Sequence, residues 1–207
     1  MNKLVTIMRN PVGSLGYITS KAYRNASVLL SNFYSHGSHH FSKDWDLLIL
    51  LDTCRVDAVK EVKDEYRFIN NIDRIYSLGG NSLEWIARTF DEKWSEELED
   101  TAYLTSNSWA KWILDEGVNS DNPQIEHPAF FTLNRYGRFN TISPHQLGKL
   151  EHVWRYTPKY GDDEGSENIK SGGVAGGTPP RTMTDRGIDV IRNEDYDRVV
   201  LHYIQPT

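Results

Sequence analysis

The pattern of hydrophobic and polar positions along the chain alternates between short apolar runs and helix-like spacings. Residues 47–51 are five consecutive leucine or isoleucine residues, and Asp52 follows them directly. A continuous apolar run of this length is typical of a strand covered on both faces in a parallel sheet, because a half-exposed strand would alternate. Ligands bind just beyond the carboxyl ends of such strands. We therefore expect Asp52 to lie at a binding site.

The residues after this strand predict a β-α-β unit and then a capped helix. Residues 58–63 fit a short amphipathic helix, and residues 67–76 fit a second strand or strand pair. A glycine-rich turn follows. Asn81 and Glu84 then have the spacing of a capping box, which places Ser82 at the first helical position.

Four further elements are predicted in the second half of the chain. They are a strand at 101–106, a helix at 107–116 ended by Gly117, a helix at 184–192 and a strand at 197–205. Between them, residues 121–181 lose periodicity, apart from a helical piece at 146–156, which is typical of a functional lid or of disorder. The order of elements predicts an α/β fold with a mostly parallel central sheet flanked by helices.

The sequence divides into a polar, loosely attached lead-in with some helix at 1–42 and an α/β domain at 43–207. The lead-in contains His36, His39 and His40, which could be a metal site. We favour a solvated linker, because a Ser/Gly-rich segment lacks the rigid spacing that fixes ligands. The last predicted strand has nothing after it to cover it. We therefore expect the 207 residues to be the N-terminal portion of a longer protein, with the domain truncated at its C-terminus.

Composition narrows the classes of partner. The chain has 23 Lys and Arg residues against 29 Asp and Glu residues and no Lys/Arg stripe, so we expect no nucleic-acid partner. Cys54 is the only cysteine, which excludes an internal disulfide. No segment has the apolar length of a membrane span, and a cytoplasmic location is expected. The oligomeric state is not readable from the sequence.

Ser82 opens a predicted helix, at a position suited to anion chemistry, and Asn107 lies at a second strand-to-helix junction. A hydroxyl at a helix N-terminus lies beside free backbone N–H groups, which would hold a phosphoryl or sulfuryl group next to it. A serine there is also common for structural reasons alone. No Gly-Lys-Ser/Thr follows the glycine pair and no Gly-x-Gly-x-x-Gly occurs, so a nucleotide-binding Rossmann protein is poorly supported.

Three segments resemble the sulfatase-like proteins of the alkaline phosphatase superfamily, and uncharacterised archaeal members most closely. They are DWDLLILLDTCRVD at 44–57, SLGGNSLEW at 77–85 and DRVVLHYIQP at 197–206. The resemblance implies a mixed sheet between helices and a divalent metal ion that positions a hydroxyl or formylglycine nucleophile. By position, Asp52 resembles the first metal-ligating aspartate and Ser82 the nucleophile, while Asn107 resembles an asparagine that contacts the substrate oxyanion.

The resemblance implies a metal-dependent hydrolase or transferase for phosphate or sulfate esters of small molecules or glycans, with Asp52 and Ser82 as metal ligands. Oxygen ligands suit zinc, manganese, calcium or magnesium, so the sequence does not distinguish among these four metals. The Cys-x-Pro-x-Arg motif of formylglycine sulfatases is absent, and Thr207 stands where relatives often have a histidine. The family's downstream Asp and His ligands do not occur here. The alternative is a catalytically inactive sulfatase-like fragment that acts as a binding or scaffold protein.

Other polar and aromatic residues have structural explanations. We predict an exposed ion pair between Arg55 and Asp57 at a helix start. His202 lies within an apolar strand and is predicted to be a packed, hydrogen-bonded core histidine rather than a ligand. The tryptophans fall at helical spacing and are expected to pack helices on the sheet.

Overall fold

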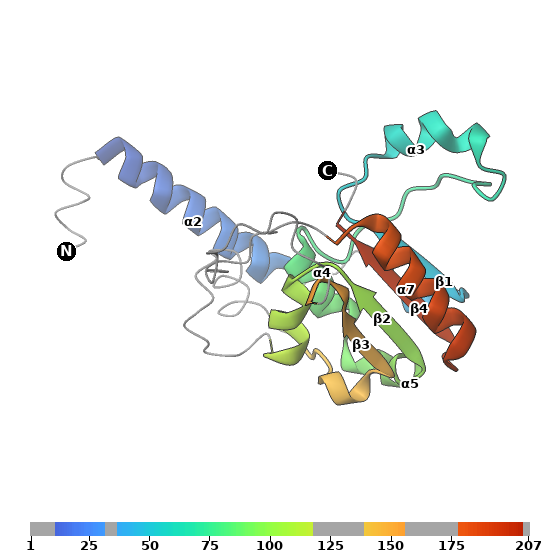
Figure 1. Cartoon of the computed structure of the whole chain (residues 1–207). Coiled ribbons are helices and arrows are strands. Elements are labelled where there is room, and N and C mark those ends of the chain that lie inside the picture. The colour runs from blue at the N-terminus through green and yellow to red at the C-terminus, as the bar shows by residue number, and fades with distance from the viewer. Residues whose placement is uncertain (1–10, 32–36, 118–138, 156–177, 205–207) are drawn as a thin grey trace, which may run out of the picture.

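The computed structural model describes residues 11–31, 37–117, 139–155 and 178–204. Within these residues, four strands form one parallel sheet in the order β1-β4-β2-β3 (Figure 1). The strands are β1 (Leu47–Leu51), β2 (Thr101–Thr105), β3 (Lys149–His152) and β4 (Arg198–Tyr203). The predicted α/β class with a parallel sheet and flanking helices is confirmed.

The helices vary from one long N-terminal helix to single turns. The α-helices are α2 (Pro11–Ser31), α3 (Val56–Val62), α4 (Ser82–Thr89), α5 (Ser95–Glu99) and α7 (Pro180–Asn193). The short turns are η1 (His40–Ser42), η2 (Lys63–Glu65), η3 (Glu92–Trp94), the π-helical η4 (Lys111–Asp115), η5 (Pro144–Gln146) and η6 (Val153–Arg155). Among the helices described, none combines the length and apolar character needed to cross a bilayer.

Two apolar clusters cover the two faces of the sheet. On one face, α7 packs on β4 and β2. Gly187 allows this close approach, because a Cβ there would lie 2.6 Å from Cδ1 of Leu201. The other face is covered by α4 and η4 around Tyr103 and Phe90, which are fully buried. Trp85, Trp94, Trp109 and Trp112 pack against this second cluster, which confirms the structural role predicted for them.

The strand register brings three strand ends to one edge of the sheet. Leu51 is aligned with Tyr203, and Thr105 is aligned with His202. The backbone N–H of Asp52 continues the pairing by donating to the carbonyl of Tyr203 at 3.1 Å. The residues that follow β1 and β2 therefore emerge beside the end of β4.

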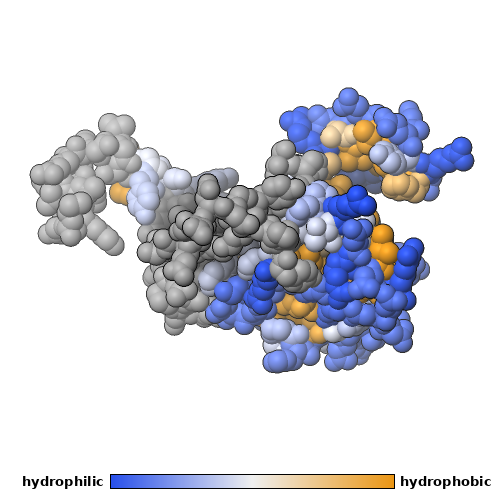
Figure 2. Space-filling model, viewed as in Figure 1, coloured by the Kyte–Doolittle hydropathy of each residue, from blue (hydrophilic) through white to orange (hydrophobic). Residues whose placement is uncertain are grey.

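The interpretation of β1 as a strand covered on both faces is wrong. β1 is an edge strand, and Leu47, Ile49 and Leu51 are 43%, 51% and 43% exposed. Leu48 and Leu50 point to the opposite face and pack against the core. Apolar surface is visible beside α7 and under α3 (Figure 2). The five aliphatic residues were consistent with two covered faces, but the described part of the chain covers only one.

Two other predicted elements are also wrong. Residues 67–76 form no strand, and Phe68 and Tyr76 are largely exposed. Residues 146–156 were expected to be helical, but β3 pairs in parallel with β2 there and η6 follows it. The remainder of the long segment predicted at 121–181 lies mostly outside the described residues.

The lead-in contains the helix expected in it, but its histidine cluster is more ordered than a solvated linker. α2 occupies residues 11–31. His39 is buried, stacks on Trp94 at 4.5 Å between ring centroids, and accepts a hydrogen bond from the backbone N–H of Phe41. The linker interpretation is therefore wrong for His39, while His36 lies outside the described residues.

Candidate active site

Asp52, Ser82 and Asn107 meet at the carboxyl edge of the sheet. The Ser82 hydroxyl donates to Oδ2 of Asp52 at 2.9 Å, and the Asn107 amide donates to the same oxygen at 3.0 Å. Asp52 follows β1, Ser82 begins α4 and Asn107 follows β2. The expected convergence of these three side chains is therefore found.

Local hydrogen bonds fix Ser82 at the start of α4. The Asn81 side chain accepts from the backbone N–H of Glu84 at 3.0 Å, as the sequence predicts. The Glu84 carboxylate, however, accepts from the backbone N–H of Gly80 at 3.1 Å rather than from that of Asn81. Gly79 lies close to the helix, since a Cβ there would lie 2.4 Å from the backbone nitrogen of Trp85. The glycine turn is thus held tightly against the first turn of α4.

Asn107 links the end of β2 to the site. Its side-chain oxygen accepts from the backbone N–H of Trp109 at 3.0 Å, while its amide N–H donates to Asp52. Its own backbone N–H donates to Oγ1 of Thr105 at 2.9 Å. These bonds define which end of the amide is oxygen, and they hold the N–H donor toward the carboxylate. Asn107 is almost fully buried, so its orientation is well restrained.

Sequence reasoning missed the contribution of His202 and Tyr103 to the site. The Tyr103 hydroxyl lies 2.7 Å from Nδ1 of His202, and Nε2 of His202 lies 3.6 Å from Oδ2 of Asp52. The tautomer with its proton on Nε2 satisfies both neighbours, because Tyr103 then donates to Nδ1. His202 is indeed a packed, hydrogen-bonded histidine, but it also faces the carboxylate. The register of β2 against β4 brings these side chains together, and no local sequence signal reports it.

The environment of Asp52 favours its charged form. The approach of the His202 ring lowers the pKa of Asp52, partial burial opposes this shift, and the hydrogen bonds from Ser82 and Asn107 lower the pKa further. At 3.6 Å the histidine contact is longer than an ordinary hydrogen bond, so we regard it as mainly electrostatic. A carboxylate with a lowered pKa is a weak base.

A pocket of about 350 Å³ opens onto Asp52, Ser82 and His202. Its wall is formed by the end of β1, the glycine turn and the start of α4, together with Trp85 and His202. Trp85 packs edge-on against His202, with the ring centroids 5.6 Å apart. The lining residues include no lysine or arginine, so Asp52 gives the described part of the pocket a negative charge.

Asp52 and Ser82 could supply part of a metal-ligand shell. Their oxygens are adjacent, and His202 is nearby. In the parts of the chain that the structure describes, no group of three or more His, Cys, Asp or Glu side chains could hold a metal ion. A usual site has about four to six ligands. The described residues therefore do not form a complete metal site.

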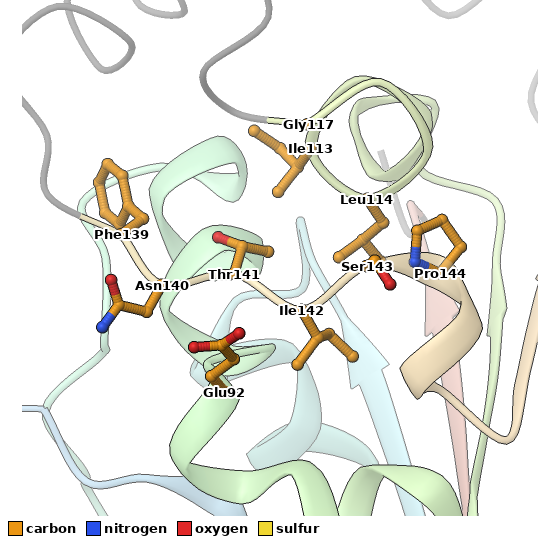
Figure 3. Close-up of a pocket in the computed structure, with 10 residues that line it drawn as sticks. All are labelled: Glu92, Ile113, Leu114, Gly117, Phe139, Asn140, Thr141, Ile142, Ser143 and Pro144. Carbon is orange, nitrogen blue, oxygen red and sulfur yellow. The ribbon is translucent and has the colours of Figure 1, made fainter.

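A second pocket, of about 400 Å³, lies between η4 and the segment that leads into η5 (Figure 3). Its walls are mainly apolar, and Glu92 is the only titratable residue among those that line it. Gly117 and Phe139, which line this pocket, flank the undescribed residues 118–138. We therefore base the candidate site on the Asp52 pocket, which combines a hydroxyl, a carboxylate and an imidazole.

Arg55 and Asp57 lie outside the site. They form an ion pair at 2.9 Å with exposed side chains at the start of α3, which confirms the prediction made for them. No protein-family model, curated protein or solved structure matches the chain. The resemblance to sulfatase-like proteins accordingly stays a prediction from the sequence segments quoted above.

Proposed function

We propose that this chain carries the nucleophile of a metal-dependent hydrolase, or phosphoryl or sulfuryl transferase, of the sulfatase-like class. Its substrates would be phosphate or sulfate esters of small molecules or glycans. The observation that supports this most directly is the shared hydrogen bonding of Ser82 and Asn107 to one oxygen of Asp52. That arrangement places a hydroxyl at a helix N-terminus next to a carboxylate with a lowered pKa.

In the proposed reaction, Oγ of Ser82 attacks the phosphorus or sulfur atom of the ester. The new bond from Oγ forms as the bond to the ester oxygen breaks, and the leaving alcohol takes up the proton that Ser82 has lost. Water then attacks the serine-bound group, which releases phosphate or sulfate and returns a proton to Ser82. The Asn107 amide and the backbone N–H groups at the start of α4 would face the nonbridging oxygens.

The charge of Asp52 explains why a cation belongs to this proposal. The carboxylate would repel an anionic ester, and its lowered pKa makes it a poor acceptor for the Ser82 proton. A divalent cation would lower the pKa of the serine hydroxyl and offset charge in the transition state. Asp52 and Ser82 are the ligands we assign, with zinc, manganese, calcium or magnesium as candidates. The remaining ligands would come from outside the described residues.

A binding or scaffold protein without catalytic activity is the second candidate. The observation in its favour is that Asp52 is the only carboxylate lining the pocket within the described residues. Metal content distinguishes the two, because an enzyme of the proposed kind should retain about one or two ions per chain after dialysis. Elemental analysis of the purified protein measures this directly. The cytoplasmic location expected from the sequence stays a prediction for either candidate.

The proposal is tested by assaying aryl phosphates, phosphodiesters and aryl sulfates with each of the four metals. We expect Ser82→Ala and Asp52→Ala each to lower turnover by at least about 100-fold, the scale of losses at nucleophiles and charge-stabilising groups. Ser95→Ala is the matched control, because Ser95 is the first residue of another helix, α5. Retention of full activity in Ser82→Ala would exclude the serine mechanism, whichever ester is turned over.

A further inference from the structure

The long helix α2 presents an apolar face that is exposed. Six large side chains on it are 42% to 74% exposed: Leu15, Tyr17, Ile18, Tyr23, Leu29 and Leu30. On a helix of 3.6 residues per turn, positions 15, 18, 22 and 29 fall on one side, positions 23 and 30 fall at its margin, and position 17 falls on the other side. Figure 1 shows α2 extending away from the sheet. The helix therefore has an amphipathic surface without a partner in the fold described above.

The charge of this part of the chain differs from that of the rest. Residues 1–43 contain five Lys or Arg residues and no Asp or Glu, whereas residues 44–207 contain 18 basic and 29 acidic residues. Within α2, sequence positions 21 and 24 are lysine and arginine, and they fall on the side of the helix opposite to position 15. An apolar face opposite a basic face is the pattern of helices that lie in the membrane interface.

We propose that α2 binds an anionic lipid surface, lying in the plane of the interface with Leu15, Ile18 and Leu29 among the acyl chains. At about 1.5 Å per residue, the 21 residues of α2 give a contact about 30 Å long. The basic positions would lie at the level of the headgroups. The net negative charge of residues 44–207 keeps the α/β domain itself away from the same surface.

The charge pattern favours a lipid surface over the other possible occupants. A second copy of α2 packed on the first would bring basic positions together without acidic partners, because residues 1–43 contain none. A nucleic acid would contact the basic face but leave the apolar face in water. An anionic bilayer satisfies both faces at once, since it offers negative headgroups and an apolar interior.

The full chain can be tested by sedimentation with vesicles of phosphatidylcholine alone and of phosphatidylcholine mixed with phosphatidylserine, which gives the surface a negative potential. We expect sedimentation only with the anionic vesicles. Leu15→Gln/Ile18→Gln should reduce binding to the level of the neutral vesicles. Lys21→Gln/Arg24→Gln should lower the partition coefficient roughly tenfold or more, and added salt should do the same.

Matched controls distinguish binding through α2 from nonspecific adsorption of the protein to vesicles. Phe68→Gln removes an equally exposed apolar side chain elsewhere, and Lys60→Gln removes a basic residue from α3, so both should bind as the wild type does. Equal binding to neutral and anionic vesicles, or unchanged binding by Leu15→Gln/Ile18→Gln, would overturn the proposal. Two other results would also overturn it. One is that the wild type does not bind vesicles and is a dimer by light scattering, while Leu15→Gln/Ile18→Gln is a monomer. The other is that the protein binds an RNA oligomer in preference to vesicles.

Discussion

The Ser82 hydroxyl donates a 2.9 Å hydrogen bond to Oδ2 of Asp52, although the two residues are 30 positions apart. Asp52 is held at the end of β1 by its backbone bond to β4, and Ser82 is held by the capped first turn of α4. Because both backbones are anchored independently, the contact depends on the fold and not on a flexible loop. The hydroxyl that we propose as nucleophile is therefore oriented before any substrate binds.

The first prediction concerns the pH dependence contributed by Asp52. Its pKa is lowered in the folded protein, so it stabilises the fold above the unfolded-state pKa of about 3.9 and loses this contribution as the pH falls toward its folded value. The difference in unfolding free energy between wild type and Asp52→Asn should therefore shrink as the pH is lowered from 6 to 3. Urea unfolding of both proteins in the presence of a chelator measures this difference at each pH. A difference that grows at low pH would contradict the assigned contacts, and Asp64→Asn on the exposed turn η2 serves as the control.

The second prediction concerns the buried hydroxyl of Tyr103. Burial raises the pKa of Tyr103, which keeps the hydroxyl protonated as a donor to His202. Tyr103→Phe leaves Nδ1 of His202 without its partner, and we expect a loss of about 1–3 kcal/mol in unfolding free energy. Tyr76→Phe, at an exposed tyrosine, should change it by less than about 0.5 kcal/mol. Equal stabilities of Tyr103→Phe and wild type would exclude the buried pair.

The third prediction concerns the glycine turn before α4. A Cβ at Gly79 would lie 2.4 Å from the backbone nitrogen of Trp85, whereas at Gly80 the nearest atom is Oε2 of Glu84 at 3.8 Å. Gly79→Ala must therefore displace the turn from α4, and we expect it to destabilise the protein by about 1–3 kcal/mol. Gly80→Ala is the matched control and should have a much smaller effect. Thermal unfolding of the two variants side by side distinguishes these outcomes.

The fourth prediction concerns His39, whose burial lowers its pKa to about 4. Below pH 6.5 the unfolded chain binds a proton at this position that the folded protein does not bind until the pH approaches 4. As the pH is lowered through this range, the contribution of His39 to the free energy of unfolding should therefore fall by about 1.4 kcal/mol for each pH unit. His39→Gln should reduce this dependence, and His145→Gln, at an exposed histidine, should retain it. Identical pH profiles for wild type and His39→Gln would show that His39 is not buried as described.

Elements specified by local signals could be predicted from the sequence. The apolar runs indicated β1 and β4, and the cap formed by Asn81 indicated the start of α4. Gly117 ends the η4 segment with a φ of 84°, as expected for a glycine in this position. The meeting of Asp52 with Asn107 was also predictable, because parallel strands end at the same edge of a sheet.

Features that depend on tertiary pairing were not predictable. Leu150 and Val153 have helical spacing, but strand pairing with β2 overrides it and gives β3. The exposure of Leu47 follows from the edge position of β1, which only the strand order reveals. Likewise, the contact between Tyr103 and His202 depends on the register of two strands that are about 100 positions apart in the chain.

A serine nucleophile would leave a covalent intermediate on Ser82, which can be detected. The protein is mixed with an aryl phosphate or aryl sulfate and one of the four metals, quenched in acid, digested and analysed by mass spectrometry. We expect the peptide containing Ser82 to gain the mass of one phosphoryl or sulfuryl group, and the same peptide of Ser82→Ala to gain none. Ester hydrolysis with the group found on another residue, or with no modified peptide under rapid quench, would contradict it.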